Sequence, residues 1–288
     1  MAAKVFAIIQ ATFKILKIKK RDIMFFQYPD YQSLDRYLIP LLRKRGIDVE
    51  FLVHDLDFMR SDWHTWDYEA KILGQAKTEY VHTEAMKLML VEKGFPLDKM
   101  KCLYLFDYYS DDEMLPKDEA LKNKNTVAFA GNLSKSAFLR HIPDSLFQNG
   151  GKMILYGAFP NDPYFTDSIV YGGKFIPENT RVLNAGWGLV WDGDSIDTCA
   201  GRYGEYLKYN SSHKLLLYLA CGIPVIVWTQ SSLAEWINER GIGISLKSLS
   251  DMMDVVNSIS EDEYGKMAER CREIGRKLRS GSFLKAVL

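Results

Sequence analysis

The densest group of side chains that could bind an anion is Asn210-Ser211-Ser212-His213-Lys214, which directly precedes the apolar run 215–220. The pattern predicts a helix over 211–220 with Asn210 or Ser211 as its N-cap. The start of a helix offers unpaired backbone N–H groups and a partial positive charge, so Lys and His are unfavourable there unless an anion is bound. The segment therefore indicates a phosphate site, although a surface helix with an incidental lysine explains the same residues about equally well.

A second polar segment follows a run that is predicted to be a strand. The segment 188–191 is apolar and ends in Asp192-Gly193. A strand that ends in Asp-Gly usually runs into a simple turn. The alternative is that Trp191 and Asp192 lie at the rim of a cleft near a bound sugar, where the segment 193–202 closes as a lid and excludes water.

In the first half of the chain, carboxylates follow the strand predicted over 48–53. If the chain transfers a group onto a hydroxyl, a general base must lie within hydrogen-bond reach of that hydroxyl. Asp55 is the best candidate for this base, with His54 and Asp57 as alternatives. A structural role for Asp55, in capping a loop, fits the sequence at least as well.

The remaining His and aromatic residues carry weaker signals. The aromatic group Trp63, Trp66 and Tyr68 is more typical of a protein core than of a platform for sugar rings. No pair of Cys, His or carboxylate residues has a metal-ligand spacing, so we expect no bound metal. We assign no chemistry to three histidines, which are His64, His82 and His141.

Strands and helices must hold these groups in place, and β-rich runs alternate with helical patterns along almost the whole chain. This alternation predicts an α/β fold with parallel sheets, whose ligands bind at the carboxyl ends of the strands. The strands are predicted over 22–27, 48–53, 79–82, 102–106, 126–130, 152–156, 170–176, 188–191, 225–228 and 242–246. The helices are predicted over 34–45, 66–76, 83–93, 137–141, 211–220, 232–240, 250–259 and 261–288.

Composition narrows the class of protein. The 288 residues include 37 Lys+Arg and 37 Asp+Glu, and this neutral balance argues against nucleic acid as the main partner. No apolar run approaches the length of a membrane span, and the start of the chain lacks the features of a signal peptide. The four Cys are far apart and are typical of reduced thiols, so we expect a soluble, cytoplasmic protein.

The run from Lys214 through Gly222-Ile223-Pro224 to Ile226 resembles the C-terminal nucleotide-sugar module of GT-B glycosyltransferases. It is similar to bacterial sugar transferases of the type that glucosylate streptococcal adhesins, and to galactofuranosyltransferases. The resemblance covers most of 126–270 and the first half of the chain more loosely. The segments that carry it are 131–136, 186–193 and 206–214, with 26–29 and 53–55 in the first half.

The resemblance implies two Rossmann-like domains that face each other across a cleft. It implies an acceptor-side domain over 1–112, apparently shortened by one βα unit, and a nucleotide-sugar domain over 126–269. The segment 270–288 would then form a helix that returns to pack on the first domain. The polar stretch 110–125 between the two domains is the best candidate for a linker.

The resemblance also implies roles for single residues. Lys214 would neutralise the nucleotide phosphates, Lys135 in the turn 131–136 would contact the same diphosphate, and 156–158 would bracket the nucleobase. Together with the helix start and the Asp-Gly tip, this gives a list of expected donor-binding residues. They are Ser134, Lys135, Tyr156, Ala158, Asp192, Asn210, Ser211, Ser212, His213 and Lys214, and the expected catalytic residues are Asp55 and Lys214.

The resemblance thus implies a glycosyltransferase that moves glucose, galactose or galactofuranose from a UDP-sugar to a glycan hydroxyl on a protein, lipid carrier or polysaccharide, without a cofactor. Many retaining relatives carry two Glu residues eight apart, but Tyr209 and Leu217 stand at those positions here, so no retaining outcome is inherited. The alternative is a non-catalytic GT-B-like binding subunit. A dinucleotide oxidoreductase is excluded because no GxGxxG follows an early strand. Self-association and attachment to the inner face of the membrane are left open.

Overall fold

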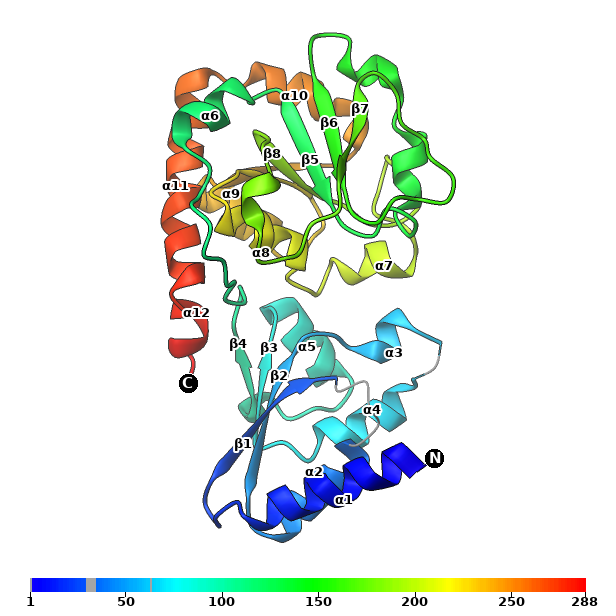
Figure 1. Cartoon of the computed structure of the whole chain (residues 1–288), viewed down its shortest axis with the longest axis vertical. Helices are drawn as coiled ribbons and strands as arrows, with labels where there is room; N and C mark the ends of the chain where they lie inside the picture. Colours follow the sequence, from blue (N-terminus) through cyan, green and yellow to red (C-terminus); the bar gives the residue numbers. More distant parts are fainter. Residues whose placement is uncertain (1, 30–34, 63) are drawn as a thin grey trace. The chain divides into compact units, whose positions relative to one another are not determined.

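The computed structural model describes residues 2–29, 35–62 and 64–288 of the chain. The chain divides into two compact units, Met1–Leu103 and Tyr104–Leu288. Each unit is built on its own sheet of parallel strands (Figure 1). This confirms the predicted α/β fold class with two Rossmann-like units.

The first unit contains a sheet with the strand order β1-β2-β3-β4. Its central strand β2 is apolar, and the side chains of Val49, Phe51 and Val53 are fully buried. The strands are β1 (Ile23–Tyr28), β2 (Asp48–Val53), β3 (Thr78–Val81) and β4 (Met100–Cys102). The helices are α1 (Ala2–Leu16), α2 (Asp35–Lys44), α3 (Asp57–Arg60), α4 (Trp66–Leu73) and α5 (Glu84–Glu92), with a 3-10 turn at Leu97–Lys99.

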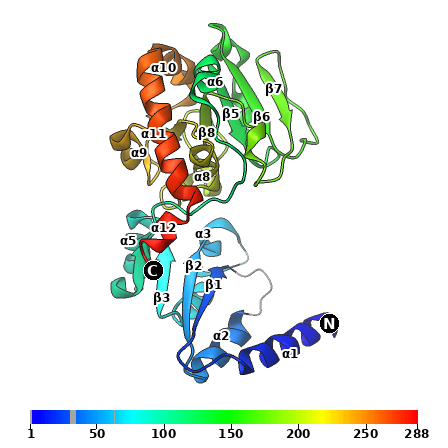
Figure 2. The ribbon, with the colours of Figure 1, turned by 60° about the vertical axis from the view of Figure 1, so that its left-hand side comes forward.

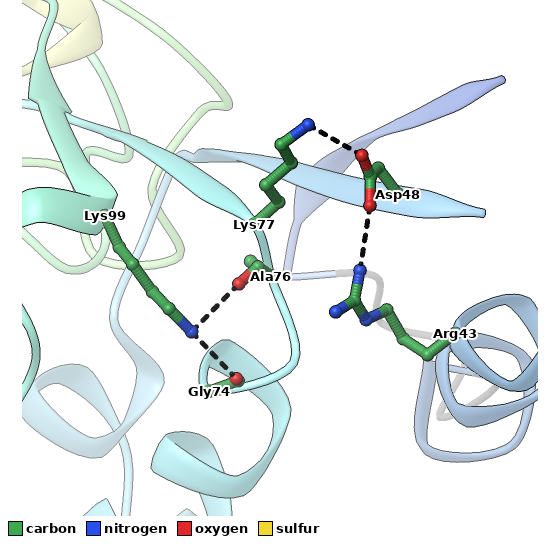
Figure 3. A network of polar contacts seen from close by, with 6 residues as sticks. All are labelled: Arg43, Asp48, Gly74, Ala76, Lys77 and Lys99. Atoms are coloured by element: carbon green, nitrogen blue, oxygen red, sulfur yellow. Dashed lines mark hydrogen bonds and ion pairs between the residues drawn. The ribbon is translucent and has the colours of Figure 1, made fainter. Parts of the chain in front are cut away.

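A polar network ties the amino-terminal edge of this sheet to the neighbouring helices (Figure 3). Asp48, the first residue of β2, accepts hydrogen bonds from Arg43 at 3.1 Å and from Lys77 at 2.7 Å. The hydrogen bond from Lys77 lowers the pKa of Asp48. Lys99 donates to the carbonyl groups of Gly74 and Ala76, which follow α4. The network lies at the amino-terminal ends of the strands. It does not involve their carboxyl-terminal ends, where Asp55 follows β2.

The second unit contains a sheet with the strand order β10-β9-β8-β5-β6-β7. The chain moves outward from β5 to β6 and β7, then returns to the other side of β5 and continues through β8, β9 and β10. The direction of winding therefore reverses between β5 and β8. The strands are β5 (Thr126–Ala130), β6 (Lys152–Tyr156), β7 (Ile169–Gly173), β8 (Trp187–Val190), β9 (Val225–Trp228) and β10 (Gly243–Leu246).

Helix α8 (His213–Ala220) packs against β8 in the core of this unit, and Leu215 to Ala220 are all buried. A Cβ atom at Gly188 would lie 2.1 Å from the ring of Tyr218, so β8 needs glycine where α8 crosses it. The long helix α11 (Glu261–Arg279) lies along α8 (Figure 2). The other helices are α6 (Lys117–Lys122), α7 (Gly201–Tyr206), α9 (Ala234–Arg240), α10 (Met252–Ser258) and α12 (Ser282–Lys285). The 3-10 turns are Ala137–His141, Asp144–Phe147, Thr180–Val182 and Leu249–Asp251.

The structure differs from the prediction most clearly in three segments. The strand predicted over 102–106 is β4, which ends at Cys102, and Tyr104 has a positive φ of 63°, which no strand continues. The stretch 110–125, predicted as a linker, contains α6. The helix predicted over 261–288 ends at Arg279, because Gly281 takes the left-handed conformation with φ 72°.

Candidate functional site

Open parallel sheets bind ligands at the carboxyl ends of their strands, where the direction of winding reverses. In the second unit this point lies between β5 and β8. The turn after β5, the residue Asp192 after β8 and the start of α8 meet there, because the side chain of Lys214, in the first turn of α8, pairs with Asp192 and lies beside Gly131. This is the candidate binding site of the second unit.

Lys214 is held in one place by groups from three elements. Its Nζ atom lies 2.6 Å from Oδ2 of Asp192 and 5.3 Å from the centre of the Phe129 ring, a cation–π contact. A Cβ atom at Gly131 would approach Cε of Lys214 to 3.0 Å, so glycine at the start of the turn makes room for the lysine. Only 14% of the Lys214 side chain is exposed, which is low for lysine.

The start of α8 differs from the prediction by one or two residues. Ser212 is the N-cap, rather than Asn210 or Ser211, and its hydroxyl accepts a hydrogen bond from the backbone N–H of Lys214 at 3.3 Å. Ser211 is buried and His213 is exposed, with its ring 6.2 Å from that of Phe106. The predicted segment therefore begins a helix at the candidate site, but its serines serve different structural roles.

Asn210 lies just before this helix start. Its carbonyl accepts a hydrogen bond from the Ser232 hydroxyl at 2.9 Å. Its side-chain oxygen is buried and has no hydrogen bond within the described part of the chain. A buried acceptor in this position can accept a hydrogen bond from a hydroxyl or N–H group of a ligand.

Ser134 and Lys135 lie on the exposed turn after β5. The backbone N–H of Lys135 donates to Oδ1 of Asn132 at 3.2 Å, which fixes the turn. Its side chain passes over the ring of Tyr203 on α7, with Nζ 5.5 Å from the ring centre. Lys135 is thus an exposed cation on the same strand-end turn that Lys214 contacts through Gly131.

At the end of β6, the side chain of Tyr156 is buried and its hydroxyl donates to the carbonyl of Val182 at 3.1 Å. Ala158 is exposed at the tip. Sequence reasoning missed Phe159, which is 57% exposed and packs edge-on against Tyr171 with ring centres 5.0 Å apart. The aromatic-rich stretch 159–171 was the available signal, and it places a cluster of aromatic rings beside the tip.

The structure contradicts the position assigned to Trp191. Trp191 is fully buried, and its ring N–H donates to the carbonyl of Ser195 at 2.9 Å, so it lies in the core instead of at a rim. The carbonyl groups of Gly193 and Ile196 accept backbone hydrogen bonds from Phe138 and Leu249. These bonds anchor the segment 193–196 to two other parts of the unit.

In the first unit, Asp55 lies just beyond the carboxyl end of β2 and forms an ion pair with Arg60. Burial raises the pKa of Asp55 to about 6, and the Arg60 charge opposes this rise. A carboxylate with a pKa near 6 is ionised at neutral pH and is still a strong enough base to accept a proton from a hydroxyl in a transition state. The predicted base therefore has a suitable environment.

Sequence reasoning missed Glu69 on α4. This buried carboxylate accepts hydrogen bonds from the backbone N–H groups of Asp57 at 3.0 Å and Phe58 at 2.8 Å, and from the Tyr28 hydroxyl at 3.1 Å. It thereby holds the first turn of α3, which follows Asp55. The signal was a Glu three and four residues before buried Ile72 and Leu73, on the apolar side of the helix.

Other residues of the first unit that the sequence analysis weighed have neighbours within this unit. Nε2 of His54 lies 2.8 Å from Oε1 of Gln27, and Nδ1 of His64 lies 3.4 Å from Oδ2 of Asp57. Trp66 packs against the rings of Phe58 and Phe95. Trp63 lies outside the described residues.

Residues 2–29, 35–62 and 64–288 contain neither a metal-binding cluster nor a membrane-spanning helix. No group of three or more His, Cys, Asp or Glu residues there is arranged to hold a metal ion. None of the helices formed by the same residues is both long and apolar enough to cross a bilayer.

Comparisons with known proteins bear on both units. The model of the glucosyltransferase 3-like C-terminal domain matches residues 127–288, and that of the N-terminal domain matches residues 8–105. The chain is 29% identical to the beta-1,6-galactofuranosyltransferase WbbI of Escherichia coli (strain K12), over 94% of this chain and 79% of that protein. It is 26% identical to glucosyltransferase 3 of Streptococcus gordonii, over 93% of this chain and 78% of that protein.

Two solved structures are similar in fold. Anabaena Alr3699/HepE, in complex with UDP, superposes with a TM-score of 0.63 at 12% identity, over 96% of this chain and 80% of that one. The sucrose-phosphate synthase of Thermosynechococcus elongatus superposes with a TM-score of 0.67 at 13% identity, over 92% of this chain and 71% of that one. The fold is that of GT-B glycosyltransferases.

Proposed function

The chain belongs to the glucosyltransferase 3-like family of GT-B glycosyltransferases, and from this premise we propose that it transfers a hexose from a UDP-sugar to a hydroxyl group of a glycan. The candidate sugars are glucose, galactose and galactofuranose, of which glucose and galactofuranose appear in the names of the two relatives above. The acceptor glycan would be carried by a protein, a lipid carrier or a polysaccharide.

The observation that carries this proposal is the position of Lys214. Its ammonium group is nearly buried at the point where the winding of the second sheet reverses, in the first turn of α8. A positive charge and a helix start at this point favour an anion of high charge density. The diphosphate of a nucleotide sugar has this character, and the similar Anabaena structure holds UDP.

In the proposed reaction, the acceptor hydroxyl oxygen forms a bond to the anomeric carbon of the sugar while the bond from that carbon to the UDP oxygen breaks. Negative charge grows on the departing diphosphate, and Lys214 and Lys135 stabilise it together with the first amides of α8. We assign no metal ion or cofactor to this step. We assign Ser134, His213 and the Asn210 side chain to contacts with the donor.

We assign Asp55 as the general base that accepts the proton of the acceptor hydroxyl. With a pKa of about 6, its carboxylate is mostly ionised at neutral pH and can accept the proton as the new bond forms. Direct attack by the acceptor with the help of such a base would invert the configuration at the anomeric carbon. Because Tyr209 and Leu217 stand in place of the Glu pair of many retaining enzymes, this outcome agrees with the sequence.

Calorimetry with UDP tests the donor site. We expect Lys214→Met to weaken UDP binding by about tenfold or more, since a buried charge-assisted contact to the diphosphate is lost. Lys266→Met removes the same charge from an exposed ion pair on α11 and should leave the affinity within about twofold. Equal UDP affinity in wild type and Lys214→Met would reject the assignment. A separate assay of UDP release with glycan acceptors distinguishes an enzyme from a binding subunit.

A further inference from the structure

The partner of Lys214 is a carboxylate that the proposed reaction does not require. Asp192 follows β8, and its Oδ2 atom lies 2.6 Å from Nζ of Lys214. Only 25% of the Asp192 side chain and 14% of the Lys214 side chain are exposed. A carboxylate is repelled by a diphosphate, so its position beside the expected phosphate ligand calls for an explanation.

The backbone around Asp192 is fixed on both sides. The preceding residue, Trp191, is fully buried. The following residue, Gly193, has a φ of 102°, and a Cβ atom there would lie 2.1 Å from the carbonyl oxygen of Ala200. A Cβ atom at Gly204 would lie 3.0 Å from the carbonyl oxygen of Asp192 itself. The backbone that carries the carboxylate is therefore held in place by close packing, and the side chain is 25% exposed, less than in a typical surface ion pair.

Lys214 is fixed as well, by the Phe129 ring below it and by the space that Gly131 leaves. Two rigidly placed, poorly hydrated charges form a much stronger pair than two exposed ones. Without Asp192, the ammonium group would lose this counter-charge, which is costly for a group this deeply placed. The structure thus pairs the expected phosphate ligand with a carboxylate of the protein itself.

We infer that Asp192 is the resident counter-ion of Lys214, which the diphosphate of the nucleotide must replace or share. This inference rests on the proposed function of Lys214 as a phosphate ligand. Asp192 holds the lysine extended at the site and competes with the diphosphate for its charge. It therefore sets the affinity for UDP and favours release of UDP after transfer, as a positioning residue that acts through Lys214.

Neutral substitution of Asp192 tests the inference. Calorimetry on Asp192→Asn and Asp192→Ala should show UDP binding about three- to tenfold tighter than in wild type, since competition and repulsion are both removed. Uridine, which lacks the diphosphate, should bind all variants within about twofold of wild type. Asp194→Asn makes the same charge change two residues away on an exposed side chain and should leave both affinities unchanged. In turnover assays, product inhibition by UDP should become stronger in the two Asp192 variants.

Unchanged or weaker UDP binding in a folded Asp192 variant would overturn the inference, as would an equal change in uridine binding. If neither variant folds, NMR of the wild-type Asp192 carboxyl carbon decides. We expect its chemical shift to change when UDP binds, because the ammonium charge is then shared, and not when uridine binds; no change with UDP would overturn the inference. If wild type binds no UDP, or if Lys214→Met leaves UDP binding unchanged, the proposed function itself is rejected. If wild type binds UDP and Lys214→Met weakens that binding, but the Asp192 variants do not bind UDP more tightly, only the role of Asp192 is rejected.

Discussion

The charge of the Asp55 carboxyl changes within the pH range that activity assays cover. Burial raises its pKa to about 6, so the carboxylate is ionised above that pH and protonated below it. A general base must be ionised to act. We therefore expect kcat/KM of the wild type to fall as pH drops through about 6, and Asp55→Asn to lower turnover at pH 7.5 by about 100-fold or more. Steady-state assays of UDP release from pH 5 to 8 measure both effects.

The matched control for this prediction is Asp48→Asn. Asp48 is an exposed aspartate at the opposite edge of the same sheet, where it pairs with Arg43 and Lys77. Its loss should leave turnover within a few-fold of wild type. If Asp55→Asn keeps wild-type turnover and the same pH profile, Asp55 is a loop-capping carboxylate and the base lies elsewhere.

Residue types near a helix start were enough to find Lys214, because the conflict between its charge and the helix dipole is local in sequence. Lys214 and Asp192 are 22 residues apart in the sequence. The sequence analysis expected both of them at the donor site, but it did not predict that they pair with each other. The hydrogen bonds that Glu69 accepts from Asp57 and Phe58 join two helices and have no sequence pattern. Partners of this kind depend on tertiary packing, which spacing along the chain does not encode.

At the scale of elements, β3 carries an unusual residue. The side chain of Glu79 is fully buried, and neither of its carboxyl oxygens has a hydrogen bond within the described residues. Burial raises the pKa of Glu79 well above its ordinary value of 4.5. The Glu79 carboxyl ionises near pH 4.5 in the unfolded chain, but only at much higher pH in the folded chain. The free energy of unfolding should therefore fall as pH rises from about 4.5 through the pKa of the folded state.

Glu79→Met replaces this carboxyl with an apolar group of similar length. We expect the free energy of unfolding at pH 8 to rise by roughly 1–3 kcal/mol, since an unpaired buried polar group is removed, and the gain to shrink toward pH 5. Urea unfolding at both pH values measures this. Glu92→Met, on the exposed side of α5, is the control and should change stability little at either pH. A loss of stability at pH 8 would mean that Glu79 has a partner that the fold depends on.

Elements with a strong apolar pattern were predicted nearly to the residue. The predicted strands over 48–53, 126–130, 152–156 and 225–228 match β2, β5, β6 and β9. The errors fall where tertiary contacts decide, as at β4, where Leu103 to Phe106 are apolar and mostly buried but leave the sheet. An apolar run predicts burial, and it predicts a strand only where a neighbouring strand is available to pair with it.

At the scale of the whole molecule, the order of the strands locates the site. In the second sheet, β5 and β8 are neighbours although 56 residues separate Ala130 from Trp187, with β6 and β7 between them in the sequence. This crossover brings the turn after β5 to Asp192 and the start of α8. Alternating strands and helices in the sequence predict a parallel sheet, but not which two strands flank the reversal. The two strands that flank the reversal could be identified only from the structure or from the family resemblance.

The division into two units makes a prediction for thermal unfolding of the full chain. A ligand that binds only the native form of one unit stabilises that unit by mass action, by about 2.7 kcal/mol at 100 times its Kd. Four of the six tryptophans, at positions 187, 191, 228 and 236, lie in the unit Tyr104–Leu288. In a variant with Trp63→Phe and Trp66→Phe, tryptophan fluorescence therefore reports on this unit alone.

We expect UDP to raise the unfolding midpoint seen by this fluorescence by several degrees, since the candidate site lies within the second unit. Uridine at the same concentration should raise it less, because it lacks the diphosphate that Lys214 is proposed to bind. Adding Lys214→Met should remove most of the difference between the two ligands. Circular dichroism, which follows both units, then shows whether the first unit unfolds with the second or at its own temperature. A midpoint that UDP and uridine shift equally would mean that the diphosphate contributes nothing to binding, which would remove the basis of the candidate site.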